Sequence, residues 1–206
     1  MTFVQVIDTR SNNLSNVLRA LTRCQVEYQV ITDAAELMAG ALVILPGVGA
    51  FASCMEKLRE HGFPSALNAH LASGGKLLGI CVGMQALANS SSEFGYHSGL
   101  ALVDAHVENL NQTHNVIVPN VNWLPLQISK GRFQQFNGQC MYFVHSYQMT
   151  NFKESTDCAA IVRYGDIDVT AIIDLGNIIG FQFHPEKSGE EGLALLRYTI
   201  DLLNQN

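Results

Sequence analysis

The chain has 206 residues, of which 48% are hydrophobic and 15% are charged, and its formal net charge is −6. This size and composition predict one domain over residues 1–206 with a substantial buried core. The negative charge argues against nucleic-acid and membrane-surface partners, and the absence of a signal peptide, a long apolar run and C-x-x-C pairs predicts a cytoplasmic protein without a zinc site.

The first half of the chain alternates between predicted strands and predicted helices. Short apolar runs that end at turn-forming residues predict strands over 3–8, 28–32, 41–45 and 76–80. Apolar residues at helical spacing, with Asn12 or Asn13 as a cap, predict a helix after the first strand. Further helices are predicted over 52–60, from Pro64 to Gly74, and over 82–89.

The second half contains mostly predicted strands, followed by one helix. The strands are predicted in the segments HVENL, NVIVP, QCMYFVHSY, AAIVRY, VTAII and NIIGFQF, between residues 106 and 183. At the start of the last helix, Ser188 and Glu191 match an S-x-x-E capping box. Together the two halves predict a three-layer α/β sandwich with a mostly parallel central sheet and a smaller antiparallel insertion.

Residues 79–85, GICVGMQ, join the strand predicted at 76–80 to the following helix. A strand, G-x-C-x-G and a helix in this order are typical of a nucleophile elbow, here with Cys81 as the nucleophile. Side chains at positions 79 and 83 would collide across the tight turn, which explains the two glycines, and the turn forces Cys81 toward an unfavourable backbone conformation. The alternative is a chance pattern in which Cys81 is an ordinary buried thiol.

The helix after Cys81 adds three features to such a site. Its N-terminus carries a partial positive charge, which favours the thiolate over the thiol. The backbone N–H of Val82 is expected to point toward the same place, where it can stabilise an oxyanion. Gln85 follows Cys81 by four residues and shares its helical face, so we expect Gln85 to contact a bound ligand.

A cysteine nucleophile needs a base, and the segment FQFHPE at 181–186 offers one. His184 ends an apolar strand, and in an extended chain its side chain points the same way as that of Glu186. A carboxylate beside an imidazole fixes the tautomer of the ring and raises its basicity. Taken singly, His184 is also compatible with a solvated strand end and Glu186 with a surface charge.

A second glycine-rich loop, LPGVGAF at 45–51, follows the strand predicted at 41–45. Such loops lie at the carboxyl edge of a parallel sheet, where binding sites form. Gly47 and Gly49 allow backbone N–H groups to turn toward a ligand and to supply a second oxyanion donor. No G-K-[ST] sequence follows, so a nucleotide site is not predicted, and a plain tight turn is the alternative.

Taken together, these segments resemble the class I, triad-type glutamine amidotransferases. The motifs that carry the resemblance are GICVGMQ, LPGVGAF, YFVHSY at 142–147 and FQFHPEKS at 181–188. PGVG combined with FVHSY is most similar to the glutaminase subunits of imidazole glycerol phosphate synthase. The similarity runs from IDTRSNNL near the N-terminus to the last helix.

The resemblance implies a mechanism and a set of residue roles. Cys81 attacks the side-chain amide of L-glutamine, His184 transfers the proton, Glu186 orients the imidazole, and a glutamyl thioester forms and is hydrolysed. The oxyanion hole is formed by Gly47, Val48, Gly49 and Val82. The glutamine is bound by Gln85, Glu93, His145, Ser146 and Tyr147. Ammonia passes to a separate (β/α)8-barrel cyclase subunit, which forms imidazole glycerol phosphate and an aminoimidazole carboxamide ribonucleotide in histidine biosynthesis, and the chain needs no metal or organic cofactor.

Two segments depart from the family pattern, and both belong to the surface that faces the cyclase subunit in the family. The usual P-H-x-G-W-N is PNVNWL at 119–124, which keeps Trp123, and the usual G-x-G-N is RSNN at 10–13, which keeps Asn13. These two residues and Lys187 are the predicted partner interface. The alternatives are a paralogous subunit that feeds ammonia to a surface-sugar amidination enzyme, a non-catalytic regulatory module on the same scaffold, and a cysteine hydrolase with another amide or ester substrate.

Overall fold

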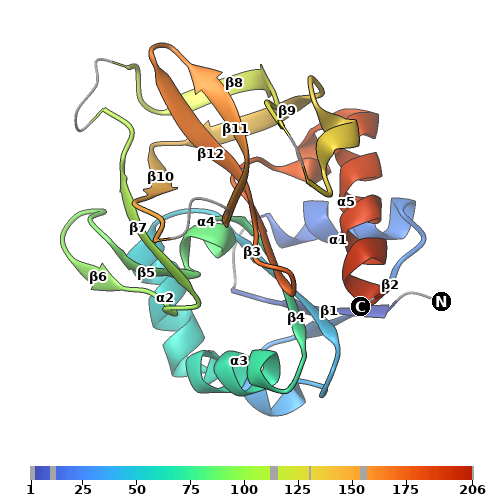
Figure 1. Cartoon of the computed structure of the whole chain (residues 1–206). Coiled ribbons are helices and arrows are strands. Elements are labelled where there is room, and N and C mark those ends of the chain that lie inside the picture. Colours follow the sequence, from blue (N-terminus) through green and yellow to red (C-terminus); the bar gives the residue numbers. More distant parts are fainter. Residues whose placement is uncertain (1–2, 10–12, 112–115, 130, 154–156, 206) are drawn as a thin grey trace.

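The computed structural model describes residues 3–9, 13–111, 116–129, 131–153 and 157–205. A seven-stranded sheet lies between two layers of helices (Figure 1). Helices α1 (Leu14–Arg23) and α5 (Gly189–Asn204) pack together on one face, and α2 (Phe51–Glu60) and α3 (Phe63–Ala72) pack together on the other. The prediction of a three-layer α/β fold is therefore confirmed.

The central sheet has the strand order β11-β12-β13-β4-β3-β1-β2. From β13 to β2 the neighbouring strands run parallel, whereas β12 and β11 are added antiparallel at one edge. The strands are β1 (Phe3–Ile7), β2 (Glu27–Ile31), β3 (Leu42–Gly47), β4 (Lys76–Cys81), β11 (Cys158–Tyr164), β12 (Ile167–Asp174) and β13 (Ile178–Phe181). Helices cover both faces, so the central strands are nearly continuous apolar runs, and every residue of β3 is buried.

Two smaller sheets lie beside the central one. A four-stranded sheet is formed by β10 (Tyr147–Thr150), β7 (Val103–Asn109), β5 (Ala88–Ser91) and β6 (His97–Ser98). An antiparallel pair is formed by β8 (Asn120–Pro125) and β9 (Cys140–His145). The strand predicted at 115–119 is wrong over its described part, because residues 116–119 form no strand and β8 begins only after Pro119, which has no N–H for a ladder.

The helix predicted over 82–89 is shorter than expected. Helix α4 covers only Val82–Gln85, and the chain then enters β5. The carbonyl of Leu87 accepts from the N–H groups of Leu102 and Val103, so long-range pairing replaces further helical hydrogen bonds. A single helical turn has a small dipole, so the positive potential near Cys81 comes from its few free N–H groups and not from a long helix.

Both predicted helix caps are used for other contacts. Ser188 precedes α5 but does not cap it, because its Oγ donates to the His184 carbonyl at 2.7 Å and accepts from the Tyr142 N–H at 2.9 Å. Glu191 accepts from the Cys140 N–H at 3.0 Å. Asn13 precedes α1 without a side-chain cap bond, and Asn12 lies outside the described residues.

Aromatic packing fixes the strand end that carries His184. The rings of Phe181 and Phe183 are stacked with their centroids 4.9 Å apart, and the ring centroids of Phe183 and Phe143 are 5.6 Å apart. Alternation along an extended chain then turns Gln182 and His184 to the opposite side. The phenylalanines thereby hold the two polar side chains toward the carboxyl edge of the central sheet.

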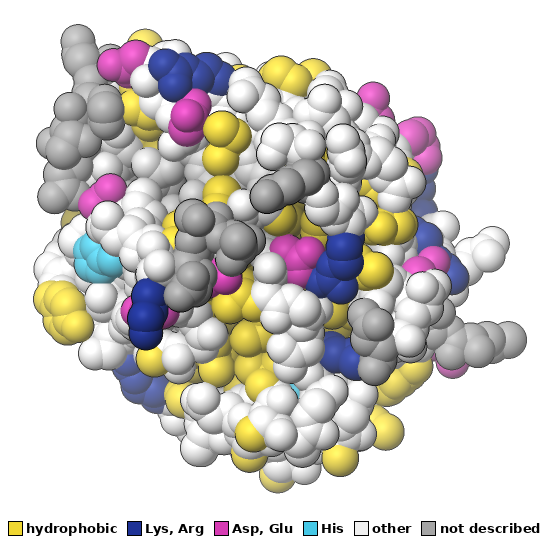
Figure 2. All heavy atoms as spheres, viewed as in Figure 1, with side chains coloured by type: hydrophobic (Ala, Val, Ile, Leu, Met, Phe, Trp, Pro, Cys, Tyr) yellow, Lys and Arg dark blue, Asp and Glu magenta, His cyan; other side chains and the backbone are white. Residues whose placement is uncertain are grey.

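The surface shows no concentration of positive charge on the face drawn in Figure 2, where Lys and Arg side chains of the described residues are dispersed among Asp and Glu. Among the described residues, no helix combines the length and apolar character needed to cross a membrane.

Candidate active site

Cys81 lies at the turn between β4 and α4 with φ 54° and ψ −112°, which confirms the predicted unfavourable conformation. A Cβ on Gly79 would lie 2.7 Å from the Met84 Cα, so this glycine relieves crowding across the turn as predicted. Positions 79 and 83 also crowd each other as predicted, because a Cβ on Gly79 would lie 2.9 Å from the carbonyl oxygen of Gly83, but the tightest contact at Gly83 is with another strand. A Cβ there would lie 1.9 Å from the carbonyl oxygen of Leu45, so Gly83 allows the elbow to touch the neighbouring strand β3.

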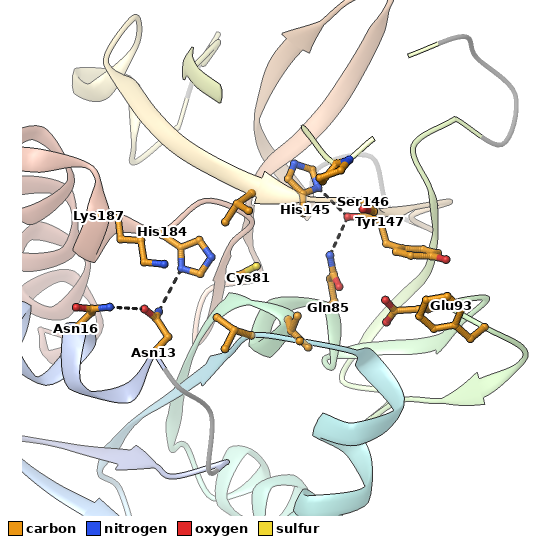
Figure 3. A pocket seen from close by; sticks show the side chains of 16 residues that line it. Asn13, Asn16, Cys81, Gln85, Glu93, His145, Ser146, Tyr147, His184 and Lys187 are labelled. Atoms are coloured by element: carbon orange, nitrogen blue, oxygen red, sulfur yellow. Dashed lines mark hydrogen bonds between the residues drawn. The ribbon is translucent and has the colours of Figure 1, made fainter. Parts of the chain in front are cut away.

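The elbow opens into a cavity of about 510 Å³ (Figure 3). Most of the predicted site residues line it, although they come from distant parts of the chain: Asn13, Val48, Gly49, Cys81, Val82, Gln85, Glu93, His145, Ser146, Tyr147, His184 and Lys187. Gly47 ends β3, Glu186 lies behind His184, and Trp123 lies on the exposed side of β8. The structure thus brings the cysteine, the histidine and the predicted ligand-binding residues to one place.

His184 and Glu186 form a buried pair. Nδ1 of His184 lies 2.7 Å from Oε1 of Glu186, so the predicted side-by-side arrangement is confirmed. A carboxylate accepts, so Nδ1 carries the hydrogen, and Nε2 is left on the side of Cys81. This Nε2 is buried and has no hydrogen-bond partner of normal geometry among the described residues, and Figure 3 shows the ring turned toward the Cys81 sulfur.

The charges around this pair favour the protonated imidazole. Burial alone would lower the pKa of His184, but the negative charge of Cys81 and the hydrogen bond and charge of Glu186 raise it to about 10. Burial would likewise raise the pKa of Glu186, but the hydrogen bond and charge of His184 and a hydrogen bond from Asn13 hold it below its ordinary value. Both shifts favour an imidazolium next to a carboxylate.

Asn13 belongs to the same cluster, which sequence reasoning did not predict. Its Nδ2 donates to Oε1 of Glu186 at 2.5 Å and lies 3.4 Å from Nδ1 of His184. Asn16 fixes the amide by donating to Oδ1 of Asn13 at 2.8 Å. The side chain that was expected to cap α1 is instead buried against the carboxylate, and no local sequence pattern identifies that contact.

His145 is held as a neutral ring. Its Nδ1 lies 2.8 Å from the carbonyl oxygen of Tyr147, which can only accept, so Nδ1 carries the hydrogen. Its Nε2 therefore accepts from Nδ2 of Asn120 at 3.0 Å. Burial lowers the pKa of His145 to about 4, aided by the positive charge of His184 and opposed by the bond to Tyr147. Asn120 was not predicted as a site residue.

Two glutamine side chains connect Tyr147 to the sulfur. Nε2 of Gln85 donates to the Tyr147 carbonyl at 2.8 Å and to Oε1 of Gln182 at 3.0 Å. Nε2 of Gln182 lies 3.8 Å from Sγ of Cys81. Sequence reasoning missed Gln182, although the alternation that pairs His184 with Glu186 also places residue 182 on the same side.

The two glycine-rich segments meet at their backbones. Gly47 pairs in register with Cys81, and a Cβ on Gly47 would lie 2.5 Å from the backbone nitrogen of Gly83. Gly49 has φ +93°, a conformation that favours glycine. Beyond this loop, Oε2 of Glu93 accepts from the N–H of Phe51, the first residue of α2, at 2.5 Å.

The remaining predicted residues lie near the mouth of the cavity and on the adjoining surface. Trp123 is 54% exposed and packs on Tyr142 with ring centroids 5.7 Å apart. Val121, on the same side of β8, is 50% exposed, and Lys187 is exposed at the cavity rim. Among the described residues, no group of His, Cys, Asp and Glu is arranged to hold a metal ion.

Comparison with known proteins identifies the family from the sequence and the fold from the structure. The sequence model of the class-I glutamine amidotransferases matches residues 5–200. The imidazole glycerol phosphate synthase subunit HisH of Herpetosiphon aurantiacus is 42% identical over 205 residues, which cover 97% of this chain and 94% of that protein. The HisH subunit of Streptococcus sanguinis is 39% identical over 203 residues, covering 98% and 97%.

Solved structures share the fold at lower identity. A glutamine amidotransferase crystal structure has a TM-score of 0.77 and 21% identity, and the match covers 98% of this chain and 99% of that one. PurLQS from Thermotoga maritima has a TM-score of 0.73 and 17% identity, with 98% of each chain covered.

Proposed function

The chain belongs to the class-I glutamine amidotransferase family, and from this premise we propose how its residues release ammonia from L-glutamine. Its nearly full-length similarity to HisH proteins assigns it as the glutamine-hydrolysing subunit of imidazole glycerol phosphate synthase in histidine biosynthesis. The observation that carries the mechanism is the position of Cys81, which shares one cavity with a His184 that is hydrogen-bonded to Glu186.

The reaction begins from a thiolate and an imidazolium. The sulfur of Cys81 attacks the side-chain carbonyl carbon of glutamine, forming a C–S bond and a tetrahedral oxyanion. His184 then gives its Nε2 proton to the leaving nitrogen, the C–N bond breaks, and ammonia and a glutamyl thioester result. Water attacks the thioester, His184 takes a proton from that water, and the C–S bond breaks to give glutamate and the thiolate. Glu186 stays ionised and orients the ring throughout.

The cavity walls supply oxyanion stabilisation and substrate binding. We assign the oxyanion donors to the backbone of Gly47, Val48, Gly49 and Val82, because the 47–49 loop and the elbow are in backbone contact. We assign the binding of glutamine to the polar groups on the other walls: Gln85, Glu93, His145, Ser146 and Tyr147. His145 acts there as a neutral ring that fixes the Tyr147 carbonyl.

The ammonia is proposed to pass directly to a (β/α)8-barrel cyclase subunit in a heterodimer. Ammonia near neutral pH is mostly protonated in water and is then not a nucleophile, so a sealed passage preserves its reactivity. The exposed Trp123 and the rim residue Lys187 are the proposed contact surface, whereas Asn13, which was also expected there, is only 4% exposed and contacts Glu186 instead. Exposed apolar side chains beside a cavity mouth suit a partner that covers the mouth.

Glutamate release from glutamine tests the catalytic assignment. Cys81→Ala is expected to abolish the glutaminase activity of the complex while the far-ultraviolet circular dichroism spectrum is retained. Glutamate release by this variant at the wild-type rate would overturn the mechanism.

The partner assignment has its own test. Purified chain is mixed with the cyclase of the histidine pathway, and the binding of the two and the glutaminase rate are measured with and without the nucleotide ligand of the cyclase. We expect a stable heterodimer and a rate that rises when the ligand is added. Failure to bind this cyclase, together with binding to a sugar-amidination enzyme, would favour the paralogous function.

A further inference from the structure

We propose that Gln182 is a positioning residue that holds the Gln85 amide by accepting its second hydrogen and that donates a hydrogen bond to the Cys81 sulfur. The proposal rests on the proposed function, because it concerns the same site. Gln182 is fully buried between β13 and His184, and the stacked rings of Phe181 and Phe183 hold its backbone on both sides. A buried amide at such a position must satisfy its hydrogen bonds inside the site.

The direction of the hydrogen bonds is set at the Tyr147 carbonyl. This oxygen accepts from Nδ1 of His145 and from Nε2 of Gln85, each at 2.8 Å, which occupies both of its lone pairs. Because a carbonyl cannot donate, the Gln85 atom that faces it must be the amide nitrogen. The flip state of Gln85 therefore follows from a backbone group that cannot change its role.

The orientation of Gln85 in turn determines which end of the Gln182 amide faces the sulfur. The second hydrogen on Nε2 of Gln85 goes to Oε1 of Gln182 at 3.0 Å, so the nitrogen of Gln182 is left to face Sγ of Cys81 at 3.8 Å. A flip of Gln182 would place two nitrogen donors against each other and an oxygen against the sulfur. The chain from Tyr147 through Gln85 and Gln182 thus presents a donor to Cys81, which favours the thiolate.

The arrangement also decides what Gln85 can recognise. Both amide hydrogens of Gln85 are used within the fold. Oε1 is therefore the polar atom of the Gln85 side chain that is left to contact a ligand in the cavity. An acceptor on the cavity wall binds a ligand that presents an N–H donor to it. L-Glutamine carries such donors in its carboxamide and in its α-ammonium group.

Two substitutions distinguish the hydrogen bond that Gln182 accepts from Gln85 from the one that it donates to Cys81. Gln182→Glu keeps an oxygen that accepts from Gln85 but replaces the donor toward Cys81 by a carboxylate oxygen. Gln182→Leu removes both contacts at similar volume. Gln5→Leu is the matched control, because Gln5 is also fully buried and hydrogen-bonded in the central sheet but donates to Gln29 and does not line the cavity.

The first measurement is the rate at which iodoacetamide alkylates Cys81 as a function of pH, followed at the Cys81 peptide by mass spectrometry. We expect Gln182→Leu to raise the apparent pKa of the thiol by about one unit and Gln182→Glu to raise it at least as much. Gln5→Leu is expected to lower the melting temperature without shifting this pKa. The assay needs no glutamine turnover, so it remains informative even if the proposed function fails.

The second measurement is steady-state glutaminase kinetics with the cyclase present. We expect Gln182→Leu to raise KM about fivefold, whereas Gln182→Glu keeps KM within about twofold of wild type. Unchanged thiol pKa and KM in Gln182→Leu, equal shifts in Gln5→Leu, or a KM in Gln182→Glu as high as in Gln182→Leu would overturn the proposal. A Cys81→Ala variant that still hydrolyses glutamine would instead refute the proposed function.

Discussion

Gly83→Ala tests whether the elbow depends on direct contact between the backbones of α4 and β3. The added Cβ would lie 1.9 Å from the oxygen and 2.8 Å from the carbon of the Leu45 carbonyl. A real Cβ keeps at least 3.0 Å from such atoms, so the two segments must separate by about 1 Å. Neither side can relieve the clash by rotating a side chain, so we expect a loss near the upper end of the range for overpacking, about 3 kcal/mol.

This loss has a thermal and a catalytic consequence. For a chain of this length it corresponds to a fall in melting temperature of about 6–12 °C. A displacement of about 1 Å also separates Val82 from the 47–49 loop, and misplacement on that scale costs about 100-fold in rate. Thermal unfolding followed by circular dichroism and the glutaminase rate with the cyclase present measure the two effects.

Gly74→Ala is the matched control for this prediction. Gly74 has φ +87° and nothing within 4 Å of the position of an added Cβ, so it carries a conformational cost of about 1–2 kcal/mol without a clash. We expect its glutaminase activity to stay within about twofold of wild type. If Gly83→Ala loses no more stability than Gly74→Ala and keeps most of its activity, the backbone contact is not what holds the elbow.

Three further outcomes are expected. Burial lowers the pKa of His145 to about 4 from 6.5, so the unfolded state binds more protons between these pH values and stability falls by up to about 3 kcal/mol as the pH drops through this window. In His145→Gln, the urea-derived stability should lose that part of its pH slope, and an unchanged slope would contradict the buried neutral ring. Cys81→Gly should be more stable than Cys81→Ala by about 1 kcal/mol, since only glycine tolerates φ 54° without strain, and equal midpoints in urea would argue against that strain. Trp123→Ala should weaken binding to the cyclase about tenfold or more in calorimetry, whereas Met38→Ala, at a residue that is 50% exposed but away from the cavity, should not. Equal effects would exclude a specific role for the tryptophan.

Sequence reasoning predicted the parts of the molecule that depend on local periodicity. The alternation of apolar runs and helical patterns identified the layers, and the glycines around Cys81 identified the elbow. The spacing of His184 and Glu186 identified their contact, because side chains two residues apart on an extended chain point to the same side.

Most of the missed features depend on partners far along the chain. Helix α4 ends early because Leu87 accepts hydrogen bonds from residues 102 and 103, and the segment before β8 lacks a strand because Pro119 has no donor. Asn13 and Ser188 are residue types that commonly cap helices. Their side chains instead bond to Glu186 and to the Tyr142 N–H, which lie 173 and 46 residues away in the chain. Capping propensity is worth about 1 kcal/mol, which a hydrogen bond to a buried carboxylate exceeds.

The side chain of Glu93 contributes both to the start of helix α2 and to the wall of the cavity. One of its carboxylate oxygens closes the first turn of α2 through the Phe51 N–H, and the residue also forms part of the cavity wall. A cationic nitrogen arriving in the cavity can share this carboxylate without taking it away from the helix, since a carboxylate has two oxygens and several lone pairs. An amino acid bound in the cavity would therefore add an electrostatic restraint at the start of α2, immediately after the loop that ends at Ala50. When the cavity is vacant, the contact between Glu93 and the Phe51 N–H lacks that restraint.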